Sequence, residues 1–138
     1  MPQKMTWHSG YSVGNAGLDE QHKQLLALCN KAADCMEDDS ARGREQFHVI
    51  LNDLCIYAEQ HFRTEEVLLG QHHYAGLTGH KAEHEDYQAK LVGFLYSASF
   101  GIIDKEGLRR YLSDWWIHHI LESDMQYRPL FARAHAAQ

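Results

Sequence analysis

Long hydrophobic runs and concentrated positive charge are both missing from this 138-residue sequence. No apolar run approaches the roughly 20 residues that a membrane-spanning helix requires, and residues 1–15 lack the apolar core of a signal peptide. The formal net charge is −6 and there is no basic run, so an electrostatic surface for nucleic acid is not expected. These absences predict a cytoplasmic protein with no membrane insertion and no nucleic-acid partner.

Cysteine and proline are also scarce, with three and two residues respectively. Cys29, Cys35 and Cys55 are odd in number and show no Cys-x-x-Cys spacing. We therefore expect reduced thiols packed at helical core positions, rather than disulfides or metal ligands. Because proline disrupts helix interiors, its scarcity favours long helices. The chain length predicts one hydrophobic core, and therefore a single domain over residues 1–138.

Hydrophobic residues recur every three or four positions in four segments, which is typical of amphipathic helices. Asp19 and Asp104 are the predicted N-caps of the first and fourth helices, and Gly101 is predicted to close the third. The predicted helices run from about Asp19 to Met36, from 44 to 69, from 78 to 98, and from Asp104 to about 126.

Four helices of this length joined by short loops predict an all-α fold, an antiparallel up-down-up-down four-helix bundle over residues 18–126. Residues 1–17 are rich in aromatic residues and glycine and have no helical period. We expect them to form an extended N-terminal arm that packs Trp7, Tyr11 and Val13 against the bundle.

Two pairs of metal-binding residue types lie on consecutive predicted helices, His61 with Glu65 and His80 with His84. Four residues turn a helix by about 400°, so each pair projects from one face and could hold one metal ion. That face is apolar, where an unpaired histidine or glutamate is costly to desolvate. An isolated pair at this spacing is more often a surface feature or a hydrogen-bonded core histidine. Two such pairs on consecutive helices favour a metal site.

The other two helices each contribute residues of the same types. His22 lies on the buried stripe of the first predicted helix, and His119 lies on that of the fourth. Asp124 follows His119 by five residues, which is a rotation of about 140° on an ideal α-helix. The two side chains are therefore predicted to reach a common site only from its edges.

Five imidazoles and two carboxylates exceed the four ligands of a tetrahedral zinc site and are too rich in nitrogen for calcium or magnesium. They suit two transition-metal ions, with imidazole favouring iron, copper or zinc, and two irons are the best fit. If both carboxylates and one solvent-derived oxygen bridge the ions, the five histidines must divide three and two. One ion is then closed, and the other keeps a position for a small ligand such as dioxygen.

The chain resembles the hemerythrin family, specifically the single-domain bacteriohemerythrins, through the segments YSVGNAGLDEQHKQLL, HFRTEE, HKAEH and WWIHHILESDMQY. The resemblance implies a di-iron centre that binds dioxygen reversibly at its open iron. The implied ligands are His80, His84 and His119 on the closed iron, His22 and His61 on the open iron, and Glu65 and Asp124 as bridges.

Two positions near Trp115 need separate interpretation. Of the adjacent His118 and His119, the family pattern selects His119 as the ligand, so we expect His118 to be solvated or to support a ligand. Trp116 stands where leucine is usual in the family, near the oxygen pocket. The larger indole either gates this pocket, slowing ligand entry or shielding bound oxygen, or simply packs in the core.

Three functional classes are compatible with these residues. The favoured one is a non-enzymatic protein, monomeric by default, that stores oxygen or delivers it to an oxygen-consuming enzyme. The second is an oxygen or redox sensing module, although such modules are usually fused to an output domain. The third is a di-iron enzyme that handles peroxide or nitric oxide, for which no extra carboxylate or cysteine nucleophile is evident.

Overall fold

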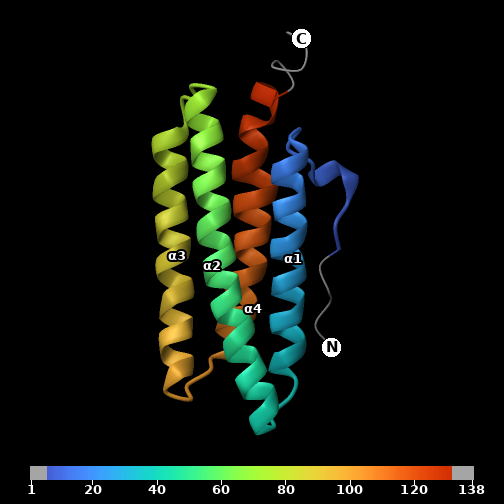
Figure 1. Ribbon diagram of the computed structural model, residues 1–138, viewed down its shortest axis with the longest axis vertical. Coiled ribbons are helices and arrows are strands. Elements are labelled where there is room, and N and C mark those ends of the chain that lie inside the picture. The colour runs from blue at the N-terminus through green and yellow to red at the C-terminus, as the bar shows by residue number, and fades with distance from the viewer. Residues whose placement is uncertain (1–5, 132–138) are drawn as a thin grey trace.

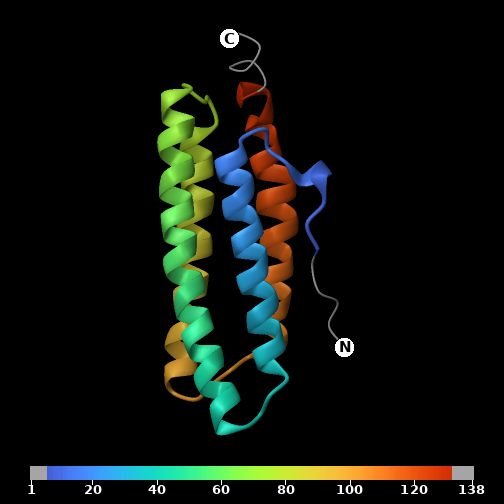
Figure 2. The same cartoon turned by 45° about the vertical axis from the view of Figure 1, so that its right-hand side comes forward.

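A computed structural model describes residues 6–131, except for the side chains of Trp116 and Ile117. Four long helical segments run antiparallel to their neighbours in chain order, which confirms the predicted all-α up-down-up-down bundle (Figures 1 and 2). The elements in order are the 3-10 turn η1 (Ser9–Tyr11), α1 (Ala16–Met36), α2 (Ala41–Gln71), α3 (Leu77–Ser99), α4 (Lys105–Asp114), the π-helix η2 (Trp115–Ser123) and the 3-10 segment η3 (Asp124–Tyr127). The last three follow one another without a break, and helical backbone continues to Phe131.

Side-chain caps mark the starts of three helices. Asn15, Ser40 and Asp104 each accept a hydrogen bond from the backbone amide three residues ahead, at 3.0, 3.1 and 2.9 Å. Each cap satisfies one amide that has no partner within its helix and stabilises that helix by about 1 kcal/mol. The end of α3 uses Gly101, whose φ of +77° is accessible to glycine at little cost. The predictions for Asp104 and Gly101 are therefore confirmed.

The prediction that Asp19 caps the first helix is wrong. The α1 helix begins three residues earlier, at Ala16, because Asn15 provides the cap. Asp19 instead accepts hydrogen bonds from the Ser12 hydroxyl at 2.5 Å and the Val13 amide at 2.9 Å. A carboxylate in the first turn of a helix is thus used to fix the N-terminal arm to the bundle.

The arm packs against the bundle as predicted, since Trp7 and Tyr11 contact one hydrophobic cluster and Val13 is fully buried in another. The larger cluster occupies the half of the bundle that contains the α1–α2 and α3–α4 loops, where its core includes Met36, Phe47 and Leu108. The smaller cluster lies at the opposite end and is made up of Val13, Leu18, Leu69, Tyr127 and Phe131. Along α2 the stretch 61–65 falls between residues of the two clusters, and this interval holds buried polar side chains.

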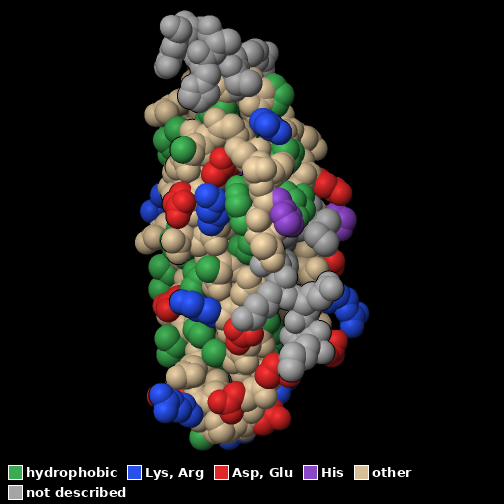
Figure 3. Space-filling view, turned by 90° about the vertical axis from the view of Figure 1, so that its right-hand side faces the viewer, with side chains coloured by type: hydrophobic (Ala, Val, Ile, Leu, Met, Phe, Trp, Pro, Cys, Tyr) green, Lys and Arg blue, Asp and Glu red, His purple; other side chains and the backbone are tan. Residues whose placement is uncertain are grey.

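All three cysteines are free, as predicted, with Cys29 buried and the other two half-buried. Lys and Arg side chains are interspersed with Asp and Glu on the face drawn in Figure 3. Among the described residues, every helix is too short or too polar to cross a membrane.

Candidate metal centre

Seven polar side chains are buried in the interior of the bundle, and all four helical segments contribute to them. Each has an exposed fraction of 5% or less. They are His22 from α1, His61 and Glu65 from α2, His80 and His84 from α3, His119 from η2 and Asp124 from η3. The four-residue spacings in α2 and α3 bring each pair to one helix face, as the sequence predicts.

The seven residues form two groups that share both carboxylates. Within each group one ligand-type atom per residue lies within 4.8 Å of all the others. The three-histidine group consists of His80, His84, His119, Glu65 and Asp124, and the two-histidine group consists of His22, His61, Glu65 and Asp124.

Glu65 extends one carboxylate oxygen toward each group. Its Oε2 lies 3.1 Å from Nε2 of His61, and its Oε1 lies 3.1 Å from Nε2 of His84 and close to Nε2 of His80. The Tyr127 hydroxyl donates a hydrogen bond to Oε2 at 3.0 Å. Glu65 therefore has the geometry of a carboxylate placed between two cation positions.

Asp124 is arranged in the same way. Its Oδ2 lies 3.1 Å from Nε2 of His22, whereas its Oδ1 lies 3.0 and 3.2 Å from Nε2 of His80 and His119. These contacts lack hydrogen-bonding geometry, so both Asp124 oxygens are buried without a hydrogen-bond partner among the described residues. A buried carboxylate in this state is costly unless a cation neutralises it.

The backbone of η2 explains how Asp124 reaches the centre. The Asp124 amide donates to the carbonyl of His119, which is an i to i+5 hydrogen bond. Residues five apart lie much closer together around the axis of a π-helix than in the α-helix assumed from sequence, which separates them by about 140°. The expectation that Asp124 approaches only from an edge is therefore corrected.

The inner faces of the imidazoles are unusually crowded with nitrogen. The Nε2 atoms of His22 and His61 are 3.1 Å apart, and those of His84 and His119 are 3.0 Å apart. When the Nδ1 atom carries the proton of a neutral ring, Nε2 presents a lone pair. Facing lone pairs repel each other, whereas a cation between them would bind both. The donor set therefore fits transition-metal ions.

Three outer-face contacts favour this tautomer, because each Nδ1 faces an acceptor oxygen on the preceding helix. We call Gln21, Glu66 and Glu83 the backing residues. Their oxygens lie 2.7 Å from Nδ1 of His61, 2.9 Å from Nδ1 of His84 and 2.9 Å from Nδ1 of His119, respectively. An acceptor at the outer nitrogen holds the ring in place and leaves Nε2 free to bind a metal.

Buried charge sets the protonation of the metal-free site. Burial lowers the pKa of His22, but the carboxylates of Asp124 and Glu65 outweigh it and raise the pKa to about 9. The same balance raises the pKa of His80 to about 10. For Glu65 burial raises the pKa, but the surrounding histidines bring it well below its usual range. Protons on the imidazoles thus supply the positive charge that metal ions would otherwise provide.

Aromatic rings close the site from the side of the larger hydrophobic cluster. The Phe62 ring stacks on the His84 imidazole, with centroids 4.0 Å apart and planes 11° apart. The Trp115 ring lies nearly parallel to that of His119 at 5.9 Å. This apolar contact excludes water from the rings and fixes their planes.

The family model described as "Hemerythrin HHE cation binding domain" matches residues 13–131. The chain belongs to the hemerythrin family. Hemerythrins are oxygen-binding proteins with non-haem iron. The match spans every helix described above, and with it the whole cluster of buried histidines and carboxylates.

Individual hemerythrins match over nearly the whole chain. The bacteriohemerythrin of Methylococcus capsulatus is 32% identical over 133 residues, covering 91% of this chain and 95% of that protein. Myohemerythrin-1 of Phascolopsis gouldii is 30% identical over 128 residues, covering 93% and 95%. A crystal structure of wild-type hemerythrin superimposes with a TM-score of 0.84 at 26% identity, covering 93% of this chain and 98% of that chain.

The structure separates the two adjacent histidines of this hemerythrin. His119 is fully buried, with Nε2 in the three-histidine group, whereas His118 is largely exposed and lies 3.4 Å from Glu122. The side chain of Trp116, the predicted oxygen-pocket gate, lies outside the described part of the structure.

Sequence reasoning missed the backing residues and Tyr127. Gln21, Glu66 and Glu83 each adjoin a candidate ligand in the sequence, but each contacts the histidine of another helix. Nothing in the spacing along one helix indicates such a pairing. Their position beside a ligand is the one local signal that could have suggested them.

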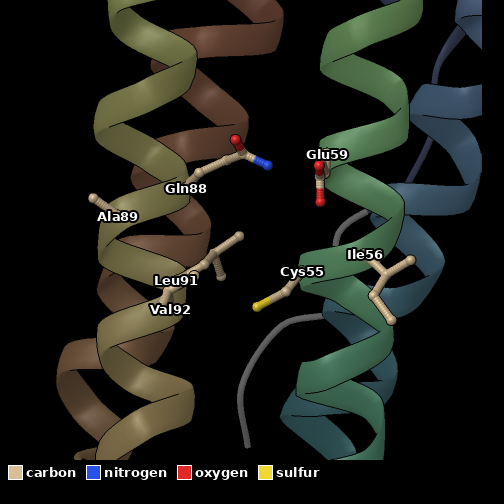
Figure 4. A pocket seen from close by; sticks show the side chains of 7 residues that line it. All are labelled: Cys55, Ile56, Glu59, Gln88, Ala89, Leu91 and Val92. Carbon is tan, nitrogen blue, oxygen red and sulfur yellow. The ribbon is translucent and has the colours of Figure 1, made fainter.

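A groove of about 410 Å³ between α2 and α3 lies apart from this centre (Figure 4). The Cys55 thiol and the Leu91 side chain point toward each other across it, and Gln88 extends toward Glu59. The lining residues include none of the seven buried candidate ligands. This groove therefore forms no part of the candidate metal centre.

Proposed function

We propose that this hemerythrin binds dioxygen reversibly at a non-haem di-iron centre and that it stores or delivers oxygen. The observation that carries this function is the division of the buried donors into two groups that share both carboxylates. A shared carboxylate with one oxygen toward each group suits two ions held side by side. A single-metal site would not need a second group of histidines.

In this proposal His80, His84 and His119 hold one iron, and His22 and His61 hold the other. Glu65 and Asp124 bridge them. Iron supplies the electrons needed to bind oxygen and recovers them on release. The two-histidine position has fewer protein ligands, so it is the one that accepts oxygen.

The protein residues hold the ligand rings in fixed orientations, exclude water from the site and reduce its net charge. The backing residues orient three rings, and Phe62 fixes the plane of His84. Two carboxylates among neutral imidazoles would offset half of the charge of two ferrous ions and so reduce the cost of burying them.

The state of Tyr127 supports a carrier rather than an enzyme. Turnover of peroxide or nitric oxide requires a group that can transfer protons near the open position. Tyr127 lies beside Glu65, but burial first and the nearby carboxylates second raise its pKa well above the usual range. Its phenol therefore stays protonated and does not act as a base. The hydrogen bond to Glu65 makes Tyr127 a support for a bridging carboxylate.

We further propose that residues 1–138 form one domain that works as a monomer in the cytoplasm, where it supplies an oxygen-consuming enzyme. Three free cysteines are compatible with a reducing compartment. On the face in Figure 3, Lys and Arg side chains are interspersed with Asp and Glu side chains, so this face has no large patch of one charge.

Visible absorption through repeated oxygen cycles tests this function. The iron-loaded, anaerobically reduced protein should gain an absorption band when air is admitted and lose it on deoxygenation, over many cycles. Irreversible oxidation in the first cycle would contradict an oxygen carrier and favour a sensor or redox enzyme. Rapid catalytic loss of added peroxide at the intact centre would favour the enzyme.

Trp116 is our proposed gate of the oxygen pocket. Trp116→Leu should change the rates of oxygen release and of irreversible oxidation, because a smaller side chain opens the path to the iron. Unchanged rates would assign Trp116 to core packing.

A further inference from the structure

The backing contacts follow one direction around the bundle. The α1 residue Gln21 contacts a ring on α2, Glu66 of α2 contacts a ring on α3, and Glu83 of α3 contacts a ring on η2. Residues 6–131, as far as the structure describes them, provide no fourth contact that would return to α1. Nδ1 of His22 is buried without a hydrogen-bond partner among the described residues.

This pattern makes the two groups of histidines chemically unequal. In the three-histidine group, carboxylates back His84 and His119. In the two-histidine group, a neutral amide backs His61, and His22 has no backing residue. A carboxylate accepts a stronger hydrogen bond from Nδ1–H than an amide oxygen does, and so raises the basicity of Nε2 more.

Glu83 is itself held in position. The Ser123 hydroxyl lies 2.8 and 3.1 Å from its two carboxylate oxygens, and its one hydrogen can be donated to this carboxylate. Because Ser123 belongs to η2, the same π-helical segment that presents His119 also fixes the carboxylate behind it. Gln21 has no comparable second hydrogen bond within the described part of the chain.

Tyr127 adds to the inequality through Glu65. Its hydroxyl donates to Oε2, the carboxylate oxygen that lies 3.1 Å from Nε2 of His61. Oε1, which faces His84, has no hydroxyl donor among the described residues. A hydrogen bond withdraws electron density from Oε2, so this oxygen is the weaker donor to a metal ion at the two-histidine position.

On the basis of the di-iron function proposed above, we propose that Gln21, Glu66, Glu83 and Tyr127 set unequal affinities at the two positions. The three-histidine position fills first and retains its ion. The two-histidine position fills second and is the exchangeable one. These four side chains act as positioning residues, because they contact candidate ligands rather than the metal.

Chelator challenge of the fully loaded ferrous protein tests this order. Under anaerobic conditions we add an excess of a chelator that forms a coloured complex with ferrous iron. It should remove iron in two phases, each of one iron per protein. The half-loaded protein should keep three ligated imidazoles. Proton NMR can count these imidazoles, because the paramagnetic ion shifts the exchangeable N–H signal of each ring that binds it.

Variants assign each phase to its position. Glu83→Gln should accelerate the slow phase by about 10- to 100-fold, the usual effect of losing a hydrogen-bond partner of a metal ligand, and leave the fast phase unchanged. Gln21→Glu should slow the fast phase by about 10-fold, because it gives His61 a carboxylate partner. Tyr127→Phe should also slow the fast phase. Glu85→Gln, an exposed change on α3, is the matched control and should alter neither phase.

The outcomes distinguish this order of affinity from the function itself. Release of both ions in one phase, or acceleration of the fast phase by Glu83→Gln, would overturn the unequal affinities while leaving a di-iron protein. Failure of the protein to take up two irons would overturn the proposed function and the order of affinity together.

Discussion

The interior of the bundle has two regions of opposite character. The half next to the α1–α2 and α3–α4 loops is filled by close-packed apolar side chains such as Phe47, Leu51 and Leu108. Nearer the other end, five imidazoles and two carboxylates meet with almost no exposed surface. The apolar half stabilises the fold by removing hydrocarbon from water, whereas the polar region holds closely spaced ring nitrogens and two buried carboxylates that need a compensating positive charge.

This contrast shows that stability and chemistry are placed in different parts of one core. Apolar packing in one half offsets the cost of burying polar groups in the other. The buried polar groups can then be positioned to bind a metal ion rather than to form hydrogen bonds with one another. Four changes test this division between the apolar half and the polar region.

Removal of metal should have the largest effect. An ion present at a thousand times its dissociation constant stabilises a folded protein by about 4 kcal/mol, so two ions contribute about 8 kcal/mol. For a domain of this size we expect the melting temperature to fall by on the order of 20 °C or more after chelation. Circular dichroism melts of loaded and chelated protein measure this. Coincident melts would show that the polar region is stable without cations.

Phe47→Ala should destabilise the apolar half by about 3–5 kcal/mol, because Phe47 is 2% exposed and its removal leaves a cavity. The loss should be equal in loaded and chelated protein, since Phe47 lies outside the metal-binding region. Urea denaturation of both forms is the measurement. Val49→Ala, at a position 53% exposed, is the control and should stay within about 0.5 kcal/mol. A much larger loss in the loaded form would show that the halves are coupled.

The metal-free protein should lose stability as pH rises above neutrality. The pKa values of His22 and His80 are raised to about 9 and about 10 in the folded state, although burial alone would lower them. A raised pKa stabilises the folded state fully below the unfolded value of 6.5, and that contribution is lost as pH rises through 9 and 10.

We expect this loss to be on the order of several kcal/mol between pH 7 and 10, because each unit of raised pKa contributes about 1.4 kcal/mol. The loaded protein should lack it, because metal binding requires neutral imidazoles. Urea denaturation at several pH values compares the two forms. Equal pH dependence in both would contradict the protonation proposed for the metal-free site.

The helix caps should have the smallest effect and should not distinguish the regions. Asn15 caps α1 at the end nearer the centre, and Asp104 caps α4 at the apolar end. Asn15→Ala and Asp104→Ala should each cost about 1 kcal/mol. Thermal melts measure both, and Asp104→Ser, which keeps an acceptor, is the control. A several-fold larger cost at Asn15 would mean that the start of α1 also supports the metal centre.

Much of the site was predictable because its spacing is local. The pairs His61–Glu65 and His80–His84 share a helix face by helix geometry alone, and the structure buries both pairs in one interior. The assignment of particular residues to particular irons stays a prediction. Helix starts were less predictable, since both Asn15 and Asp19 can serve as caps and the contacts of the arm select between them.

Periodicity within single helices already specifies four amphipathic helices and the inward direction of the buried histidines, and the short loops between the helices specify their antiparallel order. Tertiary structure alone decided the π-helical turn that brings Asp124 beneath His119, and the contacts of Gln21, Glu66 and Glu83 with rings on neighbouring helices. The physical reason is the range of the interactions. A π-turn gives up regular α-helical hydrogen bonding, and contacts across the interior, between residues distant in sequence, decide where it forms.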